Sequence, residues 1–279
     1  MKVLVTGAGG QLGTDVVAEL RGRHEVTPCG HAELDVADAD SVTNCLTRVH
    51  PEMVVNCAAW TAVDACEGDP ERADRVNGAG PANLVAAAEL IGARIVHMST
   101  DYVFDGSKPT PYVETDEPNP ASVYGRSKLL GEHAMRPEDT VLRTAWVMGP
   151  HGNNMLKTVL RLLESDGELH FVDDQHGCPT FTGDLATAVG WFVDEDHPGL
   201  FHVTNAGPTS WYELACEISE VAGHDAGRVH PIATADLDPP RPAPRPANSV
   251  LENAALRDVG LPQLRDHREA LAETLAAIR

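Results

Sequence analysis

The chain has 279 residues, of which 42% are hydrophobic and 23% charged, and its formal net charge is −21 at pH 7. This composition is typical of a globular protein with one large domain or two joined ones, and it excludes fibrous and wholly disordered chains. Nucleic acid and anionic membrane surfaces are disfavoured as partners, because both attract an excess of basic residues.

The negative charge comes from 42 acidic residues against 21 basic ones, and only Lys2, Lys108, Lys128 and Lys157 are lysines. An acid-rich surface poor in lysine suits a salt-rich cytoplasm, where counter-ions screen the repulsion between like charges. Codon usage biased toward G and C also favours arginine over lysine. A halophilic protein is therefore one of two interpretations of this composition.

The cysteines and histidines show no ligand pattern. The six cysteines contain no Cys-x-x-Cys pair and the histidines no His-x-x-x-His pair, so we expect neither a disulfide framework nor a catalytic metal site. The chain begins on a strand-like run without a signal peptide, and no apolar run approaches about 18 residues. These features predict a cytoplasmic protein with no membrane segment.

The first half of the chain alternates short apolar runs with longer helical patterns. Strands are predicted at Val3–Thr6, Glu25–Pro28, Met53–Asn56, Arg94–Met98 and Thr140–Arg143. Helices are predicted at Gly10–Arg21, Ala39–Val49, Pro70–Ile91 and Ser122–Met135. Continuously apolar strands indicate burial on both faces. The alternation predicts βαβ units and an α/β fold of the Rossmann type, with a doubly wound parallel sheet.

The regular alternation ends near residue 147. Helices are predicted at Asn154–Glu164, Gly183–Val193, Ser210–Val221 and His267–Ile278, and strands at Leu169–Val172 and Leu200–Val203. The proline-rich segment 239–246 must be extended, because proline cannot continue a helix. We predict a dinucleotide-binding domain over residues 1–147 and a smaller substrate-binding lobe over residues 148–279, some of whose strands rejoin the main sheet.

A glycine-rich turn follows the first predicted strand. Gly7, Gly10 and Gly13 form a G-x-x-G-x-x-G pattern that opens a helix. Gly7 permits a tight turn, Gly10 allows the backbone to approach a pyrophosphate, and Gly13 lets the helix pack closely on the sheet. The helix N-terminus presents free N–H groups to an anion. The pattern predicts a dinucleotide site.

The choice between NADH and NADPH depends on the end of the second strand. Residues 27–31 contain no acid to bind the ribose diol of NAD, and no Arg or Lys to hold a 2′-phosphate. His31 could tolerate that phosphate, and Asp35 and Val36 are placed to contact adenine from the next loop. We expect NADPH, with NADH as the alternative. Simple solvation of the loop is the other interpretation of His31 and Asp35.

Tyr124 and Lys128 have a Y-x-x-x-K spacing that places them one turn apart on one face of a helix. A free phenol has a pKa of about 10, and a nearby ammonium group stabilises the phenolate and lowers that pKa toward neutrality. Thr100 ends the fourth strand and can donate a hydrogen bond to the same reacting oxygen. These residues predict a site of proton transfer.

Taken together, the glycine turn, the Ser99–Asp101 strand end and the Tyr124–Lys128 pair resemble the extended short-chain dehydrogenase/reductase superfamily. Six longer stretches are similar to the dTDP-4-dehydrorhamnose reductases within it. They are Asn56–Asp64, Ser99–Gly106, Arg143–Val147, Gly152–Met155, Asp174–Thr180 and Arg245–Leu251. The likeness covers essentially the whole chain, in order.

The resemblance implies NAD(P)H-dependent reduction of the C4 ketone of dTDP-4-dehydro-β-L-rhamnose to dTDP-L-rhamnose. It implies that Tyr124 gives a proton to the ketone oxygen, that Thr100 polarises the ketone, and that Lys128 also holds the nicotinamide ribose. The cofactor would further contact Gly7, Gly10, Gln11, Leu12, Gly13, Asp35, Val36, Ala58, Ala59 and Trp60. The sugar nucleotide would contact Thr100, Asp101, Trp146, Asn154 and Arg245, the last of these on its diphosphate.

The resemblance also bears on assembly and metal binding. Some relatives carry magnesium-linked dimer contacts on acidic residues, and only Asp15 falls at a comparable position here, so Mg²⁺ and a homodimer stay open. A dehydratase is disfavoured, because such enzymes carry Thr-Asp-Glu where this chain has Thr100, Asp101 and Tyr102. Two alternatives remain: a nucleotide-sugar epimerase, and a non-catalytic subunit resembling the methionine adenosyltransferase regulatory subunit.

Overall fold

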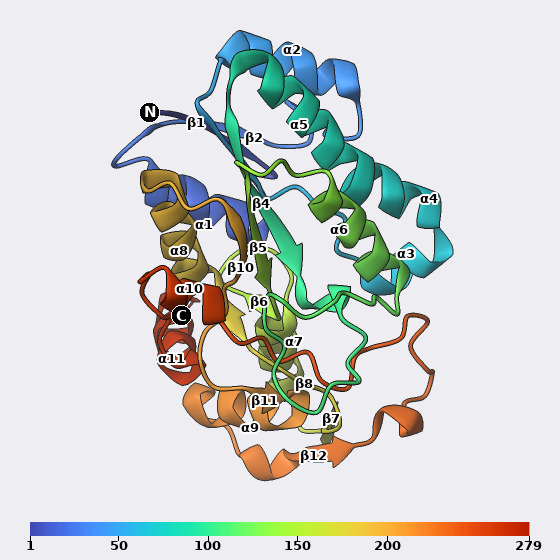
Figure 1. Cartoon of the computed structure of the whole chain (residues 1–279). Helices are drawn as coiled ribbons and strands as arrows, with labels where there is room; N and C mark the ends of the chain where they lie inside the picture. The colour runs from blue at the N-terminus through green and yellow to red at the C-terminus, as the bar shows by residue number, and fades with distance from the viewer. Residues whose placement is uncertain (279) are drawn as a thin grey trace.

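The computed structural model describes residues 1–278 and is built around a parallel sheet (Figure 1). Its six strands lie in the order β10-β5-β4-β3-β1-β2, and all neighbours pair in parallel. The strands are β1 (Lys2–Thr6), β2 (Glu25–Cys29), β3 (Met53–Asn56), β4 (Arg94–Thr100), β5 (Thr140–Thr144) and β10 (Gly199–His202). The predicted Rossmann-type parallel sheet is confirmed.

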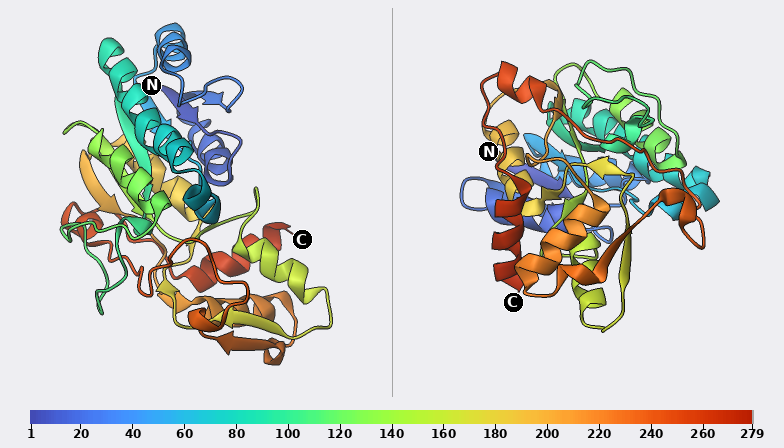
Figure 2. Two further views of the ribbon diagram at one scale, coloured as in Figure 1. Left: turned by 90° about the vertical axis from the view of Figure 1, so that its right-hand side faces the viewer. Right: turned by 90° about the horizontal axis from the view of Figure 1, so that it is seen from below.

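Helices cover both faces of this sheet (Figure 2). Val3 and Val5 of β1 belong to the core beneath α1 (Gln11–Leu20) and α8 (Thr182–Asp194), whereas Leu4 belongs to the core beneath α2 (Ala39–Val49) and α5 (Gly80–Ile91). Successive side chains of a strand point to opposite faces, so a strand buried on both sides is apolar throughout. The unbroken apolar runs of the sequence follow from this arrangement.

The predicted helix over Pro70–Ile91 consists of three pieces. They are α4 (Pro70–Ala73), a π-helical turn η1 (Asp74–Ala79) and α5. Pro81 has no N–H to donate to residue 77, and the regular helical hydrogen bonding is interrupted over the turn that precedes it. A further short helix, α3 (Val63–Gly68), precedes them and was not predicted.

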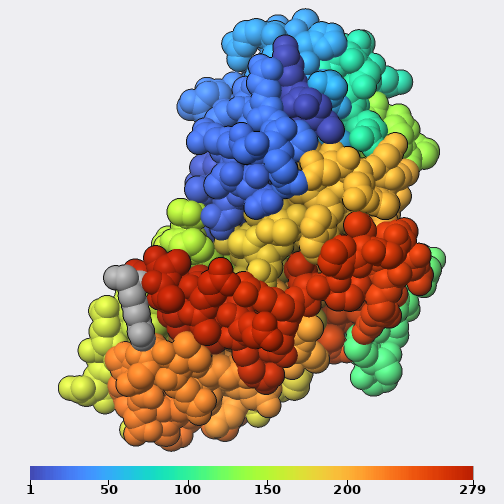
Figure 3. Space-filling model, turned by 90° about the vertical axis from the view of Figure 1, so that its left-hand side faces the viewer, coloured from blue at the N-terminus to red at the C-terminus, as the bar shows by residue number. Residues whose placement is uncertain are grey.

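The second half of the chain contributes to both parts of the molecule. Strand β10 extends the central sheet beside β5, and α8 packs against α1 (Figure 3). The remaining elements surround a separate core, formed mainly by α7 (Met155–Leu163), α9 (Trp211–Ala222) and α11 (His267–Ile278). At its edge, β12 (Val229–Ile232) pairs in parallel with β7 (Leu169–Val172).

Nine further elements complete the described chain. They are α6 (Val123–His133), α10 (Ala254–Asp258), β6 (Val147–Met148), β8 (His176–Gly177), β9 (Thr180–Phe181), β11 (Thr209–Ser210) and the 3₁₀ turns η2 (Asp101–Val103), η3 (Ala226–Arg228) and η4 (Thr234–Asp236). The proline-rich segment 239–246 contains neither helix nor strand. Among residues 1–278, no helix combines the length and apolarity that crossing a membrane requires.

Candidate active site

The glycine turn leaves β1 where the strand order reverses, since the chain goes first to β2 on one side and then to β3 on the other. Such switch points are where open α/β sheets bind ligands. Gly7 has φ +61°, and a Cβ on Gly13 would lie 2.2 Å from the Gly7 carbonyl oxygen. Both positions therefore need glycine, one for its backbone conformation and one for the close approach of α1.

A cavity of about 390 Å³ lies beside this turn. Its walls come from the glycine turn, from the loop after β2 and from the loop after β3. Seven residues predicted to bind cofactor line it: Gly7, Gly10, Asp35, Val36, Ala58, Ala59 and Trp60. The predicted residues Gln11, Leu12 and Gly13 follow in the first turn of α1 and are not part of this lining.

The residues of this cavity fit a dinucleotide. A Cβ on Gly9 would meet no atom within 4 Å, so the backbone of the turn is open to a pyrophosphate. Val36 and Ala58 offer small apolar walls for an aromatic base. His31 has its Nδ1 3.8 Å from Asp35 Oδ1 at the loop after β2.

Helix α6 carries Tyr124 and Lys128 to the carboxyl end of β4. It is capped by Ser122, whose hydroxyl accepts a hydrogen bond from the Gly125 N–H at 3.1 Å. A Cβ on Gly125 would lie 2.1 Å from the Tyr102 carbonyl oxygen, so glycine at this position allows the helix to approach closely. The result is that both side chains are buried beside Thr100, with Tyr124 8% and Lys128 2% exposed.

The Thr100 hydroxyl lies between two ionisable groups. It donates to Asp101 Oδ1 at 2.9 Å and is also hydrogen-bonded to the phenol of Tyr124. Burial raises the pKa of Tyr124, and the hydrogen bond with Thr100 only partly opposes that increase. Tyr124 is therefore a protonated phenol at neutral pH, which is the form that can donate a proton. The expected lowering of its pKa by Lys128 does not hold in the free protein.

Lys128 does not lower the pKa of Tyr124 as expected, because its ammonium group has another partner. Nζ donates to the Met98 carbonyl oxygen at 2.6 Å. Burial lowers the pKa of Lys128 to about 8, while the negative charge of Glu132 acts in the opposite direction. Its positive charge is thus present at neutral pH and is lost in mildly alkaline solution.

We expect the catalytic activity to depend on the protonation of Lys128. Lys128 is protonated below about pH 8 and neutral above it, so kcat/KM of the wild-type protein should fall as the pH rises through that value. In Lys128→Arg the guanidinium stays charged, and the fall should move to higher pH. A steady-state pH profile of both proteins measures the effect. An alkaline fall at the same pH in both would contradict the assignment.

The other end of α6 is anchored by a buried ion pair. Glu132 accepts two hydrogen bonds from Arg143 of β5, at 2.9 and 2.7 Å, and a third from Ser99 of β4. The two charged side chains are 7% and 3% exposed. Since Glu132 lies one turn after Lys128, the pair also fixes the stretch of helix that positions the lysine.

Asp101 and Trp146 are two of the residues predicted to contact the substrate. Asp101 is buried, burial raises its pKa to about 6, and its Oδ2 has no partner among the described residues. Trp146 has φ +46° and stacks on Trp211 with ring centres 3.5 Å apart. A Cβ on Gly177 would lie 2.4 Å from its indole, so the ring is confined on both faces. The roles of both residues toward substrate remain predictions.

The two remaining substrate candidates have protein partners. Asn154 caps α7 through Lys157 N and donates to Gln11 Oε1 at 2.9 Å, which links the lobe to the glycine turn. Arg245 makes two hydrogen bonds to Asp64, at 2.9 and 2.8 Å, and these tie the proline-rich segment to α3. A role of Arg245 on the substrate diphosphate remains a prediction and requires that this pair open.

The residues around Asp15 do not fit a magnesium site. The Asp15 carboxylate lies 3.2 Å from His151 Nε2. No group of three or more His, Cys, Asp or Glu side chains that could hold a metal ion occurs in the part of the chain that the structure describes. We therefore derive no step through a metal.

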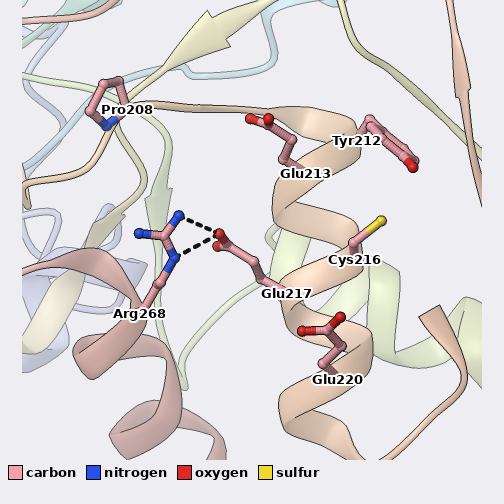
Figure 4. A pocket seen from close by; sticks show the side chains of 7 residues that line it. All are labelled: Pro208, Tyr212, Glu213, Cys216, Glu217, Glu220 and Arg268. Atoms are coloured by element: carbon pink, nitrogen blue, oxygen red, sulfur yellow. Dashed lines mark hydrogen bonds and ion pairs between the residues drawn. The ribbon is translucent and has the colours of Figure 1, made fainter.

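A second hollow lies between α9 and α11 (Figure 4). Glu217 in its wall accepts a hydrogen bond from Arg268 Nε at 2.9 Å and pairs with His267 Nε2 at 2.7 Å. Burial raises the pKa of Glu217, but these two partners outweigh burial and lower it overall. The hollow is thus the surface of an ion-paired contact that joins two helices, and Thr100, Tyr124 and Lys128 are not in it.

Sequence analysis missed two residues of the site. Glu132 follows Lys128 at the same helical spacing that separates Lys128 from Tyr124, and this spacing could have revealed it. Arg72 lines the dinucleotide cavity from α4, some distance along the chain from the glycine turn and the loop after β2. No local pattern marks it, because only the fold brings α4 to the cavity.

Comparisons with known proteins cover the whole chain. A family model described as the RmlD substrate binding domain matches residues 1–279. A dTDP-4-dehydrorhamnose reductase of Mycolicibacterium smegmatis is 41% identical over 99% of this chain and 86% of its own. A crystal structure of such a reductase from Clostridium acetobutylicum has a TM-score of 0.95 at 43% identity, covering 100% and 99% of the two chains. One from Bacillus anthracis, in complex with NADP, has a TM-score of 0.95 at 33% identity, covering 99% of each.

Proposed function

The chain belongs to the RmlD substrate-binding-domain family, and from that premise we propose that it reduces the C4 ketone of dTDP-4-dehydro-β-L-rhamnose to dTDP-L-rhamnose with a nicotinamide cofactor. The observation that carries this proposal is the placement of Thr100, Tyr124 and Lys128 beside the dinucleotide cavity. Trp60 lines that cavity and packs in the same apolar cluster as Tyr124, and the ammonium of Lys128 acts on the pKa of Cys57, which also lines it. Proton donor and cofactor cavity are therefore neighbours.

The reaction needs a proton at the ketone oxygen as hydride reaches the carbon, and a reduced nicotinamide supplies the hydride when bound. Tyr124 gives its phenolic proton to that oxygen. Thr100 turns its hydroxyl hydrogen from Asp101 Oδ1 to the same oxygen and so stabilises the charge that develops there. Lys128 keeps a positive charge near the phenolate that Tyr124 becomes, until solvent returns the proton. Burial of all three side chains keeps competing water away.

We propose the following contacts to the sugar nucleotide. The free Oδ2 of Asp101 accepts a hydrogen bond from a sugar hydroxyl, since a buried acceptor without a partner is costly. Trp146 offers its indole as an apolar border for the sugar, and Asn154 lies where the lobe meets the cofactor turn. Arg245 exchanges Asp64 for the diphosphate, which accepts the same paired hydrogen bonds from a guanidinium.

We propose NADPH as the preferred cofactor, with NADH as the alternative. Support comes from the lack of an acid at the end of β2 and from the NADP bound to the Bacillus anthracis relative. Tyr124 and Lys128 hold the nicotinamide ribose, and Gln11, Leu12 and Gly13 meet the pyrophosphate from the start of α1. A cytoplasmic location, a homodimer and a division at residue 147 into a dinucleotide-binding domain and a substrate-binding lobe complete the proposal.

The test is oxidation of NADPH by the purified protein with the 4-keto sugar nucleotide as substrate. Turnover that depends on both compounds supports the reductase. An epimerase would instead retain stoichiometric NAD through purification, which absorbance of the isolated protein reveals. A regulatory subunit would show no turnover and would co-purify with a synthetase.

The net charge of −21 leads to a separate prediction for stability. If the acidic surface is an adaptation to salt, we expect the thermal midpoint to rise steeply with KCl, because the screening length falls from about 10 Å at 0.1 M to about 3 Å at 1 M. Thermal unfolding over a series of KCl concentrations measures this. Full stability in dilute buffer would favour codon bias as the origin of the composition.

A further inference from the structure

Arg72 is the only permanently charged cation among the residues that line the dinucleotide cavity of the described chain. Its guanidinium carbon lies 4.4 Å from the centre of the Trp60 ring. The backbone of Trp60 is held at both ends by Asn77, which accepts from its N–H at 2.8 Å and donates to its carbonyl at 3.0 Å. The backbone that carries the ring is therefore fixed, and the guanidinium rests on the ring at the edge of the cavity.

The charge of Arg72 is not neutralised by the protein. Arg143, Arg245 and other arginines pair with carboxylates, but no carboxylate within residues 1–278 lies within 4.0 Å of the Arg72 guanidinium. In a chain with 42 acidic and 21 basic residues, a free positive charge beside a cavity is available to an anionic ligand. The side chain is exposed, and its stack on Trp60 is weaker than a charge-assisted bond to phosphate.

We propose that Arg72 leaves the Trp60 ring and pairs with a phosphate of the bound dinucleotide. The inference rests on the proposed use of a nicotinamide cofactor and adds a residue to that site. The glycine turn offers only neutral N–H groups, from the β1 side, and residues 27–31 after β2 contain no Arg or Lys. Arg72 is thus the lining residue able to supply a counter-charge. The phosphate is either the pyrophosphate, common to both cofactors, or the 2′-phosphate that only NADPH carries.

The experiment compares Arg72→Gln with Arg75→Gln by titrating each protein with NADPH and with NADH, without sugar nucleotide, and reading the change in nucleotide fluorescence. Arg75 is an exposed arginine of the adjoining η1 turn and does not line the cavity, so it controls for loss of one positive charge. We expect the Kd of Arg72→Gln to rise about tenfold for at least one cofactor and that of Arg75→Gln to change less than about threefold. Arg72→Lys, which keeps the charge, should recover part of the affinity.

The pattern of losses identifies the phosphate. Weaker binding of NADPH alone assigns Arg72 to the 2′-phosphate, and an equal loss for both cofactors assigns it to the pyrophosphate. Unchanged binding of both by Arg72→Gln, or an equal loss in Arg75→Gln, overturns this inference and leaves the proposed function standing. Wild-type protein that binds neither cofactor overturns the proposed function and, with it, this inference.

Discussion

Tyr124→Phe should lower kcat by about 10²-fold or more, since it removes the general acid and leaves the ring in place. The phenol is 8% exposed and its edge-to-face packing on Tyr102, with ring centres 5.5 Å apart, does not need the hydroxyl. We therefore expect the Kd for NADPH and the unfolding midpoint to stay close to the wild-type values. Steady-state oxidation of NADPH with the 4-keto sugar nucleotide measures the loss.

Tyr102→Phe is the matched control for this experiment. Tyr102 is the neighbouring phenol, and burial likewise raises its pKa, but its bond to Thr100 comes from the backbone N–H, at 3.2 Å, and a change to Phe leaves that bond in place. Its loss should leave most of the turnover intact. Equal turnover by wild type and Tyr124→Phe, or an equally large loss in Tyr102→Phe, would show that the proton comes from elsewhere.

Glu132→Gln should destabilise the fold by about 3–5 kcal/mol, because it leaves the buried Arg143 without its counter-charge. That is a large share of the total stability of a typical protein, about 5–15 kcal/mol. Arg143 already has one buried nitrogen, Nη1, with no partner, so the site has no spare acceptor to compensate. Urea unfolding followed by circular dichroism measures the change.

The pair of the partly buried Arg136 and the exposed Glu138 provides the comparison. Its charged atoms are 3.5 Å apart and the Glu138 side chain is 55% exposed, so Glu138→Gln should cost no more than about 1 kcal/mol. Similar midpoints for the two variants would mean that burial of the Glu132 pair contributes little. Glu132→Gln should also lower the pKa of Lys128 further, since the carboxylate raises it.

The sheet was predictable from sequence because its strands are buried on both faces. Short apolar runs such as Met53–Asn56 show no helical periodicity that would compete with the prediction of a strand. The predicted bounds of this run agree with those of β3. The helix over Pro70–Ile91 was less predictable, since its apolar spacing continues through the π-helical turn before Pro81. The spacing of hydrophobic residues predicts which face of a helix is buried. It does not predict whether the backbone hydrogen bonds are α-helical or π-helical.

The site was predictable where chemistry depends on local spacing, as for Tyr124 and Lys128. The partners of these residues were not, because they come from distant segments: Met98 for Lys128 and Asp64 for Arg245. The pKa of Tyr124 differs from expectation for the same reason. The burial of Tyr124 and the position of Lys128 Nζ are determined by the packing of the whole structure. The spacing of these two residues on a helix predicts neither.

Strand β10 has a consequence for synthesis of the chain. It covers the outer edge of β5, yet it is translated more than fifty residues after β5 ends. During that interval the nascent sheet presents a bare row of backbone N–H and carbonyl groups, of the kind that recruits strands from other chains. Slowed elongation between residues 145 and 199, or the loss of a chaperone that shields emerging strands, should therefore favour aggregation on the ribosome over native folding.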